Sequence, residues 1–172
     1  MMKDKHILDA TCGSRTIWFD KNCSSAIYMD CREEHETAIW KSTKNESVRK
    51  LDVEPDIKAD FTAMPFDDNS FELVVFDPPH LVKVSESAWL KKKYGKLPEN
   101  WQKLIHDGFW ECMRVLKPYG TLIFKWSEIE ISTREIISAI GVEPLFGHRS
   151  GKKMNTHWLC FMKGVSDEGK ID

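Results

Sequence analysis

Short apolar runs alternate along the chain with polar or helix-periodic stretches. Runs of this length, without the alternation of polar residues that marks a strand with one solvent-exposed face, predict strands buried on both faces. The first five are 6–8, 26–29, 57–59, 73–76 and 121–126. Two further runs, 144–147 and 158–162, predict a final pair of strands that adds an antiparallel edge.

Helical periodicity is clear in two places. Apolar side chains recur at helical spacing over residues 99–116, which predicts an amphipathic helix. A breaker and turn at residues 117–120 should end it before the next strand. Ser132 predicts the N-cap of a second helix, with Glu135 as its capping-box partner and Gly141 as its stop.

Two polar stretches have weaker patterns. Residues 33–56 are poorly periodic, and we expect a helix followed by a loose connection. Residues 82–98 predict a long loop, since they combine lysines with turn residues. Its expected anchors are Trp89, Leu90 and Tyr94. Long loops in compact domains are usually functional or disordered.

The alternation of strands and helices predicts βαβ units. We expect an α/β, Rossmann-like, doubly wound and mostly parallel seven-stranded sheet, with one antiparallel edge strand and helices on both faces. The length of 172 residues suits one domain. We assign residues 1–164 to it and expect a flexible tail at 165–172.

Acids stand at the ends of the first four predicted strands. They are Asp9, Asp30, Asp60 and Asp77. The two prolines after Asp77 cannot continue a ladder, so the fourth strand stops there. Because the carboxyl ends of parallel strands share one edge, these carboxylates should converge on one cleft.

The spacing of the first two acids indicates a nucleoside-type ligand. Asp30 follows Asp9 by 21 positions, the interval at which an acid meets a ribose in nucleotide-binding folds. The loop 9–15 has one glycine, which suits a dinucleotide pyrophosphate poorly. Asp60 could accept a hydrogen bond from an adenine amino group beside Phe61, or could only form a local turn.

The cysteine content predicts a cellular compartment, and the charge distribution predicts a type of partner. Five cysteines without a CxxC pair favour buried thiols in a reducing cytoplasm, with no metal site. We expect no signal peptide and no membrane span. Residues 83–103 and 147–163 each carry a net charge of +4, so the remainder carries −2 − 4 − 4 = −10. This asymmetry favours a local anionic partner, although solvated loops are also often lysine-rich.

With these motifs in this order, the chain resembles class I S-adenosylmethionine-dependent methyltransferases over residues 5–164. The resemblance rests on residues 8–13, Asp30, residues 60–61, residues 77–80 and residues 116–120. It implies S-adenosylmethionine as cofactor, with its methionine moiety along residues 10–13, its ribose on Asp30 and its adenine beside Asp60. The implied cofactor-binding residues are Asp9, Ala10, Thr11, Cys12, Gly13, Arg15, Asp30, Asp60 and Phe61.

The tetrapeptide at the fourth strand end resembles the Asp/Asn-Pro-Pro-aromatic motif of enzymes that methylate amino nitrogens of nucleobases. The implied catalytic residues are Asp77, Pro78, Pro79 and His80. By this resemblance, Asp77 and the Pro78 carbonyl accept hydrogen bonds from the target amine, which makes its nitrogen more nucleophilic. His80 departs from the motif: an imidazole can stack on a base or act as an acid or base.

The basic segments also carry aromatic residues, which suits stacking and phosphate contact with a nucleic acid. The expected substrate-binding residues are Lys83, Trp89, Tyr94, Lys125, Arg149, Lys152, Lys153 and His157. These aromatics could instead anchor their segments to the core. Without a separate target-recognition domain, we expect RNA, single-stranded DNA or a flipped DNA base, with a homo-oligomer or specificity partner as an option.

Two other functions stay open. The same cofactor site could serve a small molecule or a protein, with His80 as base. The chain could also be a non-catalytic cofactor-binding module, which the full set of strand-end acids makes the weakest alternative.

Overall fold

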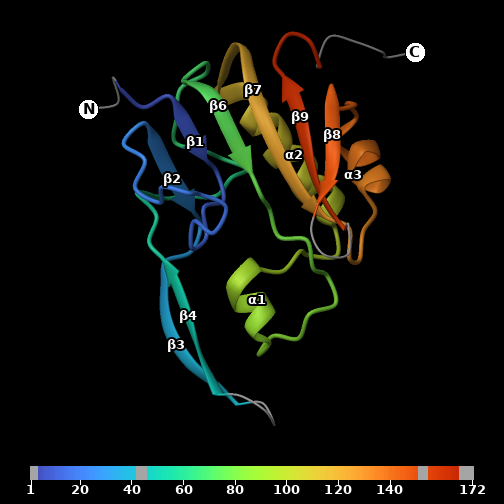
Figure 1. Ribbon diagram of the computed structural model, residues 1–172. Helices are drawn as coiled ribbons and strands as arrows, with labels where there is room; N and C mark the ends of the chain where they lie inside the picture. The colour runs from blue at the N-terminus through green and yellow to red at the C-terminus, as the bar shows by residue number, and fades with distance from the viewer. Residues whose placement is uncertain (1–3, 42–45, 151–154, 167–172) are drawn as a thin grey trace.

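The fold is taken from a computed structural model that describes residues 4–41, 46–150 and 155–166. Seven strands form one sheet in the order β5-β2-β1-β6-β7-β9-β8 (Figure 1). Their bounds are β1 (Ile7–Asp9), β2 (Ala26–Asp30), β5 (Ile57–Lys58), β6 (Phe71–Phe76), β7 (Leu116–Ser127), β8 (Phe146–Ser150) and β9 (Thr156–Met162). β9 runs antiparallel to β7 and β8, and the other neighbouring strands of this sheet pair in parallel. The expected Rossmann-like, mostly parallel sheet is confirmed.

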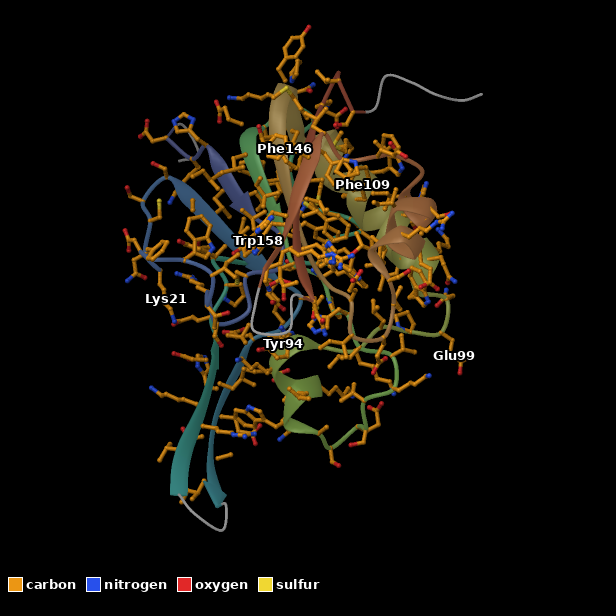
Figure 2. The ribbon with its side chains drawn as sticks, turned by 45° about the vertical axis from the view of Figure 1, so that its right-hand side comes forward. Lys21, Tyr94, Glu99, Phe109, Phe146 and Trp158 are labelled. Carbon is orange, nitrogen blue, oxygen red and sulfur yellow. The ribbon has the colours of Figure 1, made fainter. Side chains whose placement is uncertain are left out.

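One core lies between the sheet and two long helices. These are α2 (Trp101–Val115) and α3 (Thr133–Ile140). Helix α2 packs against α3, β6 and β7, and its Phe109 is fully buried within this layer (Figure 2). Gly108 lets α2 approach closely, because a Cβ there would lie 2.5 Å from the Phe61 ring. Burial of these apolar side chains is the main driving force for this part of the fold.

The two helix predictions are confirmed. Ser132 caps α3 in a capping box with Glu135, and Gly141 ends it at φ 77°. After α2 the structure differs from the expectation, because β7 begins directly at Leu116 and contains the predicted turn. The predicted turn is still visible within the strand as irregular backbone, since Tyr119 has φ 62° and the register with β6 shifts there.

The opposite face of the sheet is covered differently. Residues 10–25 form turns rather than a helix, and their Trp18 packs on Tyr28 of β2 with ring centroids 5.0 Å apart. The helices are therefore less evenly spread over the two faces than we expected. A hydrogen-bonded turn segment covers this face in place of a helix.

The prediction of a helix within residues 33–56 is wrong. This segment forms an antiparallel hairpin of β3 (Glu34–Lys41) and β4 (Glu46–Val53). Figure 1 shows the hairpin projecting beyond the lower edge of the sheet, beside the short helix α1 (Trp89–Tyr94). Only its base joins the core, through Leu51 and Val53. The cross-strand hydrogen bonds hold two mostly polar strands together without a buried face.

Smaller expectations also change. The predicted loop 82–98 contains α1 and is anchored by Leu97, which is buried, while Leu90 is exposed. The last two strands begin at different residues than predicted but are present. Cys31 is exposed, so the expectation that all five thiols are buried is wrong. The described residues include no helix long and apolar enough for a membrane crossing.

Candidate functional site

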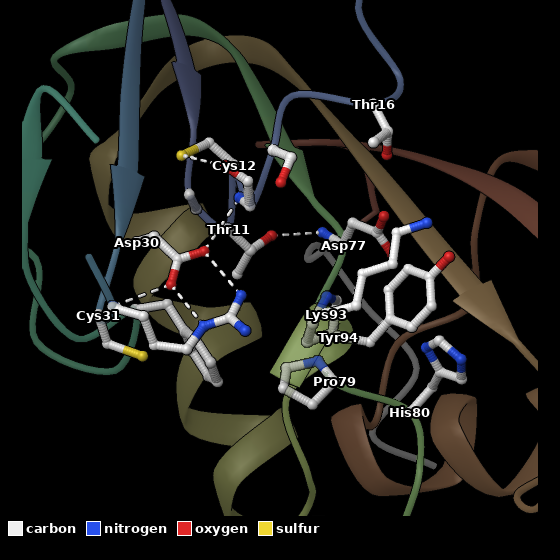
Figure 3. Close-up of a pocket in the computed structure, with 16 residues that line it drawn as sticks. Thr11, Cys12, Thr16, Asp30, Cys31, Asp77, Pro79, His80, Lys93 and Tyr94 are labelled. Atoms are coloured by element: carbon white, nitrogen blue, oxygen red, sulfur yellow. Dashed lines mark hydrogen bonds and ion pairs between the residues drawn. The ribbon is translucent and has the colours of Figure 1, made fainter. Parts of the chain in front are cut away.

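The strand-end acids lie at the point where the sheet order reverses. From the central pair, β1 leads outward to β2 and β6 leads the other way to β7. Ligands bind at such a switch point in open α/β sheets. A cleft here is lined by residues of both loops and of α1 (Figure 3). The predicted site residues that line it are Ala10, Thr11, Cys12, Gly13, Asp30, Phe61, Asp77, Pro78, Pro79, His80 and Tyr94.

The loop after β1 is tied to both neighbouring strand ends. The Thr11 hydroxyl accepts a hydrogen bond from the backbone N–H of Asp77 at 2.8 Å. The Gly13 N–H donates to Asp30 at 3.0 Å. Gly13 itself has φ 48°, a conformation that favours glycine. These bonds fix residues 10–13 against the two loops that face them.

Asp9 lies beneath this loop rather than in the cleft. Its carboxylate accepts hydrogen bonds from the indole N–H of Trp18 at 2.6 Å and from the Thr11 N–H at 3.2 Å. Asp9 is almost fully buried, and burial raises its pKa to about 7. Both of its oxygens already have partners, so the ligand contact expected of it stays a prediction.

Asp30 is engaged by a residue that the sequence analysis missed. Arg32 donates to Asp30 Oδ1 through its backbone N–H and its Nε, each at 3.0 Å. Its Nη2 donates to Oδ2 at 3.2 Å, beside the bond from Gly13. A carboxylate has about four acceptor positions, and these four donors fill them. A ligand hydroxyl can bind Asp30 only where Arg32 releases it.

Asp77 forms an ion pair across the sheet with Lys125 of β7. Lys125 Nζ lies 2.5 Å from Asp77 Oδ2, and both side chains are about four-fifths buried. No described residue donates a hydrogen bond to the other oxygen, Oδ1. Lys125, expected to contact substrate, therefore positions the Asp77 carboxylate and leaves one of its oxygens available. Lys125 also lines the neighbouring pocket.

His80 and Tyr94 separate the cleft from a second pocket of about 560 Å³. Their ring centroids lie 5.6 Å apart, and both residues line both cavities. Burial lowers the pKa of His80, which favours its neutral form. Lys83, Lys125 and Glu130 add charge to the second pocket. His80 therefore lies where the two cavities meet, and Asp77, which lines the cleft, contacts the second pocket through Lys125.

Two expected ligand residues have structural contacts instead. The Asp60 carboxylate accepts from the N–H and the hydroxyl of Thr62, both at 2.8 Å, which is the turn alternative. The Arg15 guanidinium lies 3.7 Å from the centre of the Tyr28 ring and donates to two backbone carbonyls. Neither residue lines the cleft. Phe61 does, packed edge-on against Phe76.

The described residues of the second basic segment do not line the cleft. Arg149 and His157 both contact Glu128, at 3.8 Å and 3.2 Å, and His157 is buried. Lys152 and Lys153 lie outside the described residues. From the first segment, Trp89 lines a groove beside α1, and Lys83 lines the second pocket. The described residues contain no group of three or more side chains able to hold a metal.

No family model matches the sequence, and no curated protein is similar to it in sequence. Solved structures are similar in fold. A SAM-dependent methyltransferase from Leishmania major is 12% identical with a TM-score of 0.52, and the match covers 93% of this chain and 65% of that chain. The chain shares the fold of that methyltransferase. The inferred methylase HI0767 from Haemophilus influenzae is 13% identical over 94% of this chain and 88% of that chain, and its TM-score of 0.46 is too low to support an argument.

Proposed function

We propose that the protein is an S-adenosylmethionine-dependent methyltransferase that acts on an exocyclic amino nitrogen of a nucleobase in RNA or DNA. The observation that carries this proposal is the place where the strand-end cleft meets the second pocket: His80 lines both, and Asp77 in the cleft pairs with Lys125 in the second pocket. A transferase needs its donor and acceptor on the two sides of one reacting centre. The methyltransferase fold of the Leishmania major protein supports the choice of donor.

The groups that line the cleft suit the proposed cofactor, although the cleft has a volume of only about 70 Å³ and must widen to admit it. Above Gly13, no atom lies within 4 Å of the position that a Cβ would take, so the backbone of residues 10–13 is open to a ligand. Phe61 offers an apolar wall, and Asp30 can accept from a ribose once Arg32 moves. When bound, the cofactor supplies a methyl group on a positively charged sulfur.

The residues around Asp77 suit an aromatic amine. The unoccupied acceptor position at Asp77 Oδ1 and the Pro78 carbonyl can accept its two N–H groups, which directs the nitrogen lone pair towards the cleft. Lys125 fixes the carboxylate through Oδ2. Tyr94, from α1, supplies beside His80 the aromatic ring that the tetrapeptide lacks. A base held against Tyr94 would present its amine to Asp77.

The proposal is tested by cofactor titration followed by labelled-methyl transfer to total RNA and DNA. We expect Asp77→Ala to keep cofactor affinity and to lower the rate about 10²-fold or more, as for the loss of one aligned group in a reacting site. Asp77→Asn keeps one acceptor oxygen and should lose less. The control is Asp67→Ala, which removes an exposed acid from the turn before β6. Undiminished transfer by Asp77→Ala would exclude the role assigned to Asp77.

One observation favours a small-molecule acceptor as the second candidate. The pocket beyond His80 is compact and contains Lys83, Lys125 and Glu130, which suits a polar metabolite that carries an amine. Label found only in the low-molecular-weight fraction would favour this candidate over a nucleic acid. Tight cofactor binding without turnover on any extract would indicate a binding module.

A further inference from the structure

The β3–β4 hairpin and α1 stand side by side beyond the carboxyl edge of the sheet (Figure 1). Both oxygens of the Glu36 carboxylate lie 2.7 Å from Lys92 Nζ, which joins β3 to α1. Arg32, at the end of β2, donates to the Lys92 carbonyl at 2.8 Å. These contacts hold the hairpin and α1 as the two walls of one groove.

The groove between them is basic and aromatic. It has a volume of about 360 Å³ and is lined by Arg49, Lys50, Trp89, Leu90, Lys93 and Tyr94. Three cations and two aromatic rings thus line it without a carboxylate. Lys93 and Tyr94 also line the strand-end cleft (Figure 3), so the groove leads into it.

Nearby acids form no ion pair with Lys50 or Lys93 among the residues that the structure describes. Glu36 is neutralised by Lys92. Asp52, which contacts His35, and Glu54 line a neighbouring pocket with Lys50 and Lys93. Lys50 and Lys93 form no ion pair with another described residue. Their charges therefore remain available to an anion that lies along the groove.

We propose that this groove is the track on which a single-stranded nucleic acid lies as its target base enters the second pocket, which shares Leu90 and Tyr94 with the groove. Lys50 and Lys93 contact phosphates, and Trp89 stacks on a base next to the target. A single strand fits better than a duplex, because stacking on Trp89 and Tyr94 needs base faces that a duplex hides. The nature of the partner rests on the proposed function, whereas the position of the track rests on the hairpin and α1.

The test is binding of fluorescently labelled single-stranded RNA and DNA 12-mers without cofactor, followed by anisotropy at several salt concentrations. We expect Lys50→Gln to weaken binding and to reduce the slope of log affinity against log salt by about 0.7, the loss of one phosphate contact. Trp89→Ala should weaken binding about tenfold with little change in that slope. The matched control is Lys117→Gln, because Lys117 pairs with Glu72 at the opposite edge of the sheet; it should bind like wild type.

Wild-type binding by both Lys50→Gln and Trp89→Ala would overturn the track, and so would an equal loss in Lys117→Gln. Circular dichroism of each variant separates a local loss from unfolding. An acidic peptide of equal charge serves as competitor. If it displaces the oligonucleotide and loses as much affinity in Trp89→Ala, the partner is a protein and the track is overturned. Variant-sensitive oligonucleotide binding without any base methylation supports the track and contradicts the proposed function. Base methylation that is unaffected by these variants supports the proposed function and contradicts the track.

Discussion

The two sides of the sheet, divided between β1 and β6, are built by different means. On one side, β1, β2 and β5 have three, five and two residues and are joined by turns and a hairpin. This side shares the apolar core through Leu8, Ile27 and Met29. It adds polar contacts of its own, such as Asp9 with Trp18 and Arg15 with Tyr28. On the other side, longer strands pack on α2 and α3 through apolar residues such as Phe109 and Phe161.

The difference teaches where each side is vulnerable. Apolar burial is insensitive to pH but is lost when a side chain is truncated. Buried polar groups depend on their partners and on their protonation state. The cleft lies at the junction, so it takes Asp30 from the polar side and Asp77 from the apolar side.

The largest effect is expected on the apolar side. Phe109→Ala should lower the free energy of unfolding by about 3–5 kcal/mol, because Phe109 is fully buried with its ring 4.9 Å from that of Phe161. Urea unfolding measures this change. The control Phe146→Ala, at a ring that is 69% exposed on β8, should stay within about 0.5 kcal/mol of wild type. A loss below about 1 kcal/mol for Phe109→Ala would contradict the comparison.

The polar side should show its own pH dependence through Asp9. The pKa of Asp9 rises from 3.8 to about 7 on folding, so between these values the folded carboxyl holds a proton that the unfolded one has released. Stability should therefore fall as pH rises from about 4 to about 7, by at most about 4 kcal/mol for this shift. Urea unfolding at pH 5 and pH 8 measures the difference.

Asp9→Asn should remove this part of the pH dependence, even where the substitution lowers the free energy of unfolding at both pH values. Asp60→Asn changes an exposed strand-end acid and should leave the Asp9 contribution in place. An unchanged difference between pH 5 and pH 8 in Asp9→Asn would show that Asp9 is not its source.

The smallest effect concerns a polar contact on the apolar side. Ser132→Ala should cost about 1 kcal/mol, because the Ser132 hydroxyl accepts the N–H of Glu135 at the start of α3. Ser132→Thr keeps the hydroxyl and should recover most of the loss. Thermal unfolding of the three proteins gives the ranking. An equal loss in Ser132→Thr would mean that shape, rather than capping, matters at this position.

The apolar side was largely predictable from the sequence. Buried runs and the 3.6-residue period identify β6, α2 and the core of β7, and the capping box identifies α3. The hairpin was missed because it stands outside the core, so most of its side chains need no apolar alternation. Exposed Ile39 and Val48 lie directly opposite each other on it, and they were its faint signal.

The candidate site was predictable in its acids but not in their partners. Asp30 and Asp77 were expected from strand ends, while Arg32 needed the loop conformation to turn back on Asp30. The pairing of Lys125 with Asp77 depends on the β6–β7 register, in which Phe76 faces Phe124. Aligning the two strands at their carboxyl ends would not give this register, because β7 continues to Ser127.

The geometry of the hairpin base also makes the hairpin an exchangeable attachment. Glu34 is paired directly with Val53, so the chain leaves the domain and returns to it at one point. Residues could be added or removed in pairs at the far end without moving β2 or β5, since a longer loop costs little entropy. Proteins with this architecture could then acquire different hairpins on an unchanged domain, and an engineer could lengthen, shorten or graft this one.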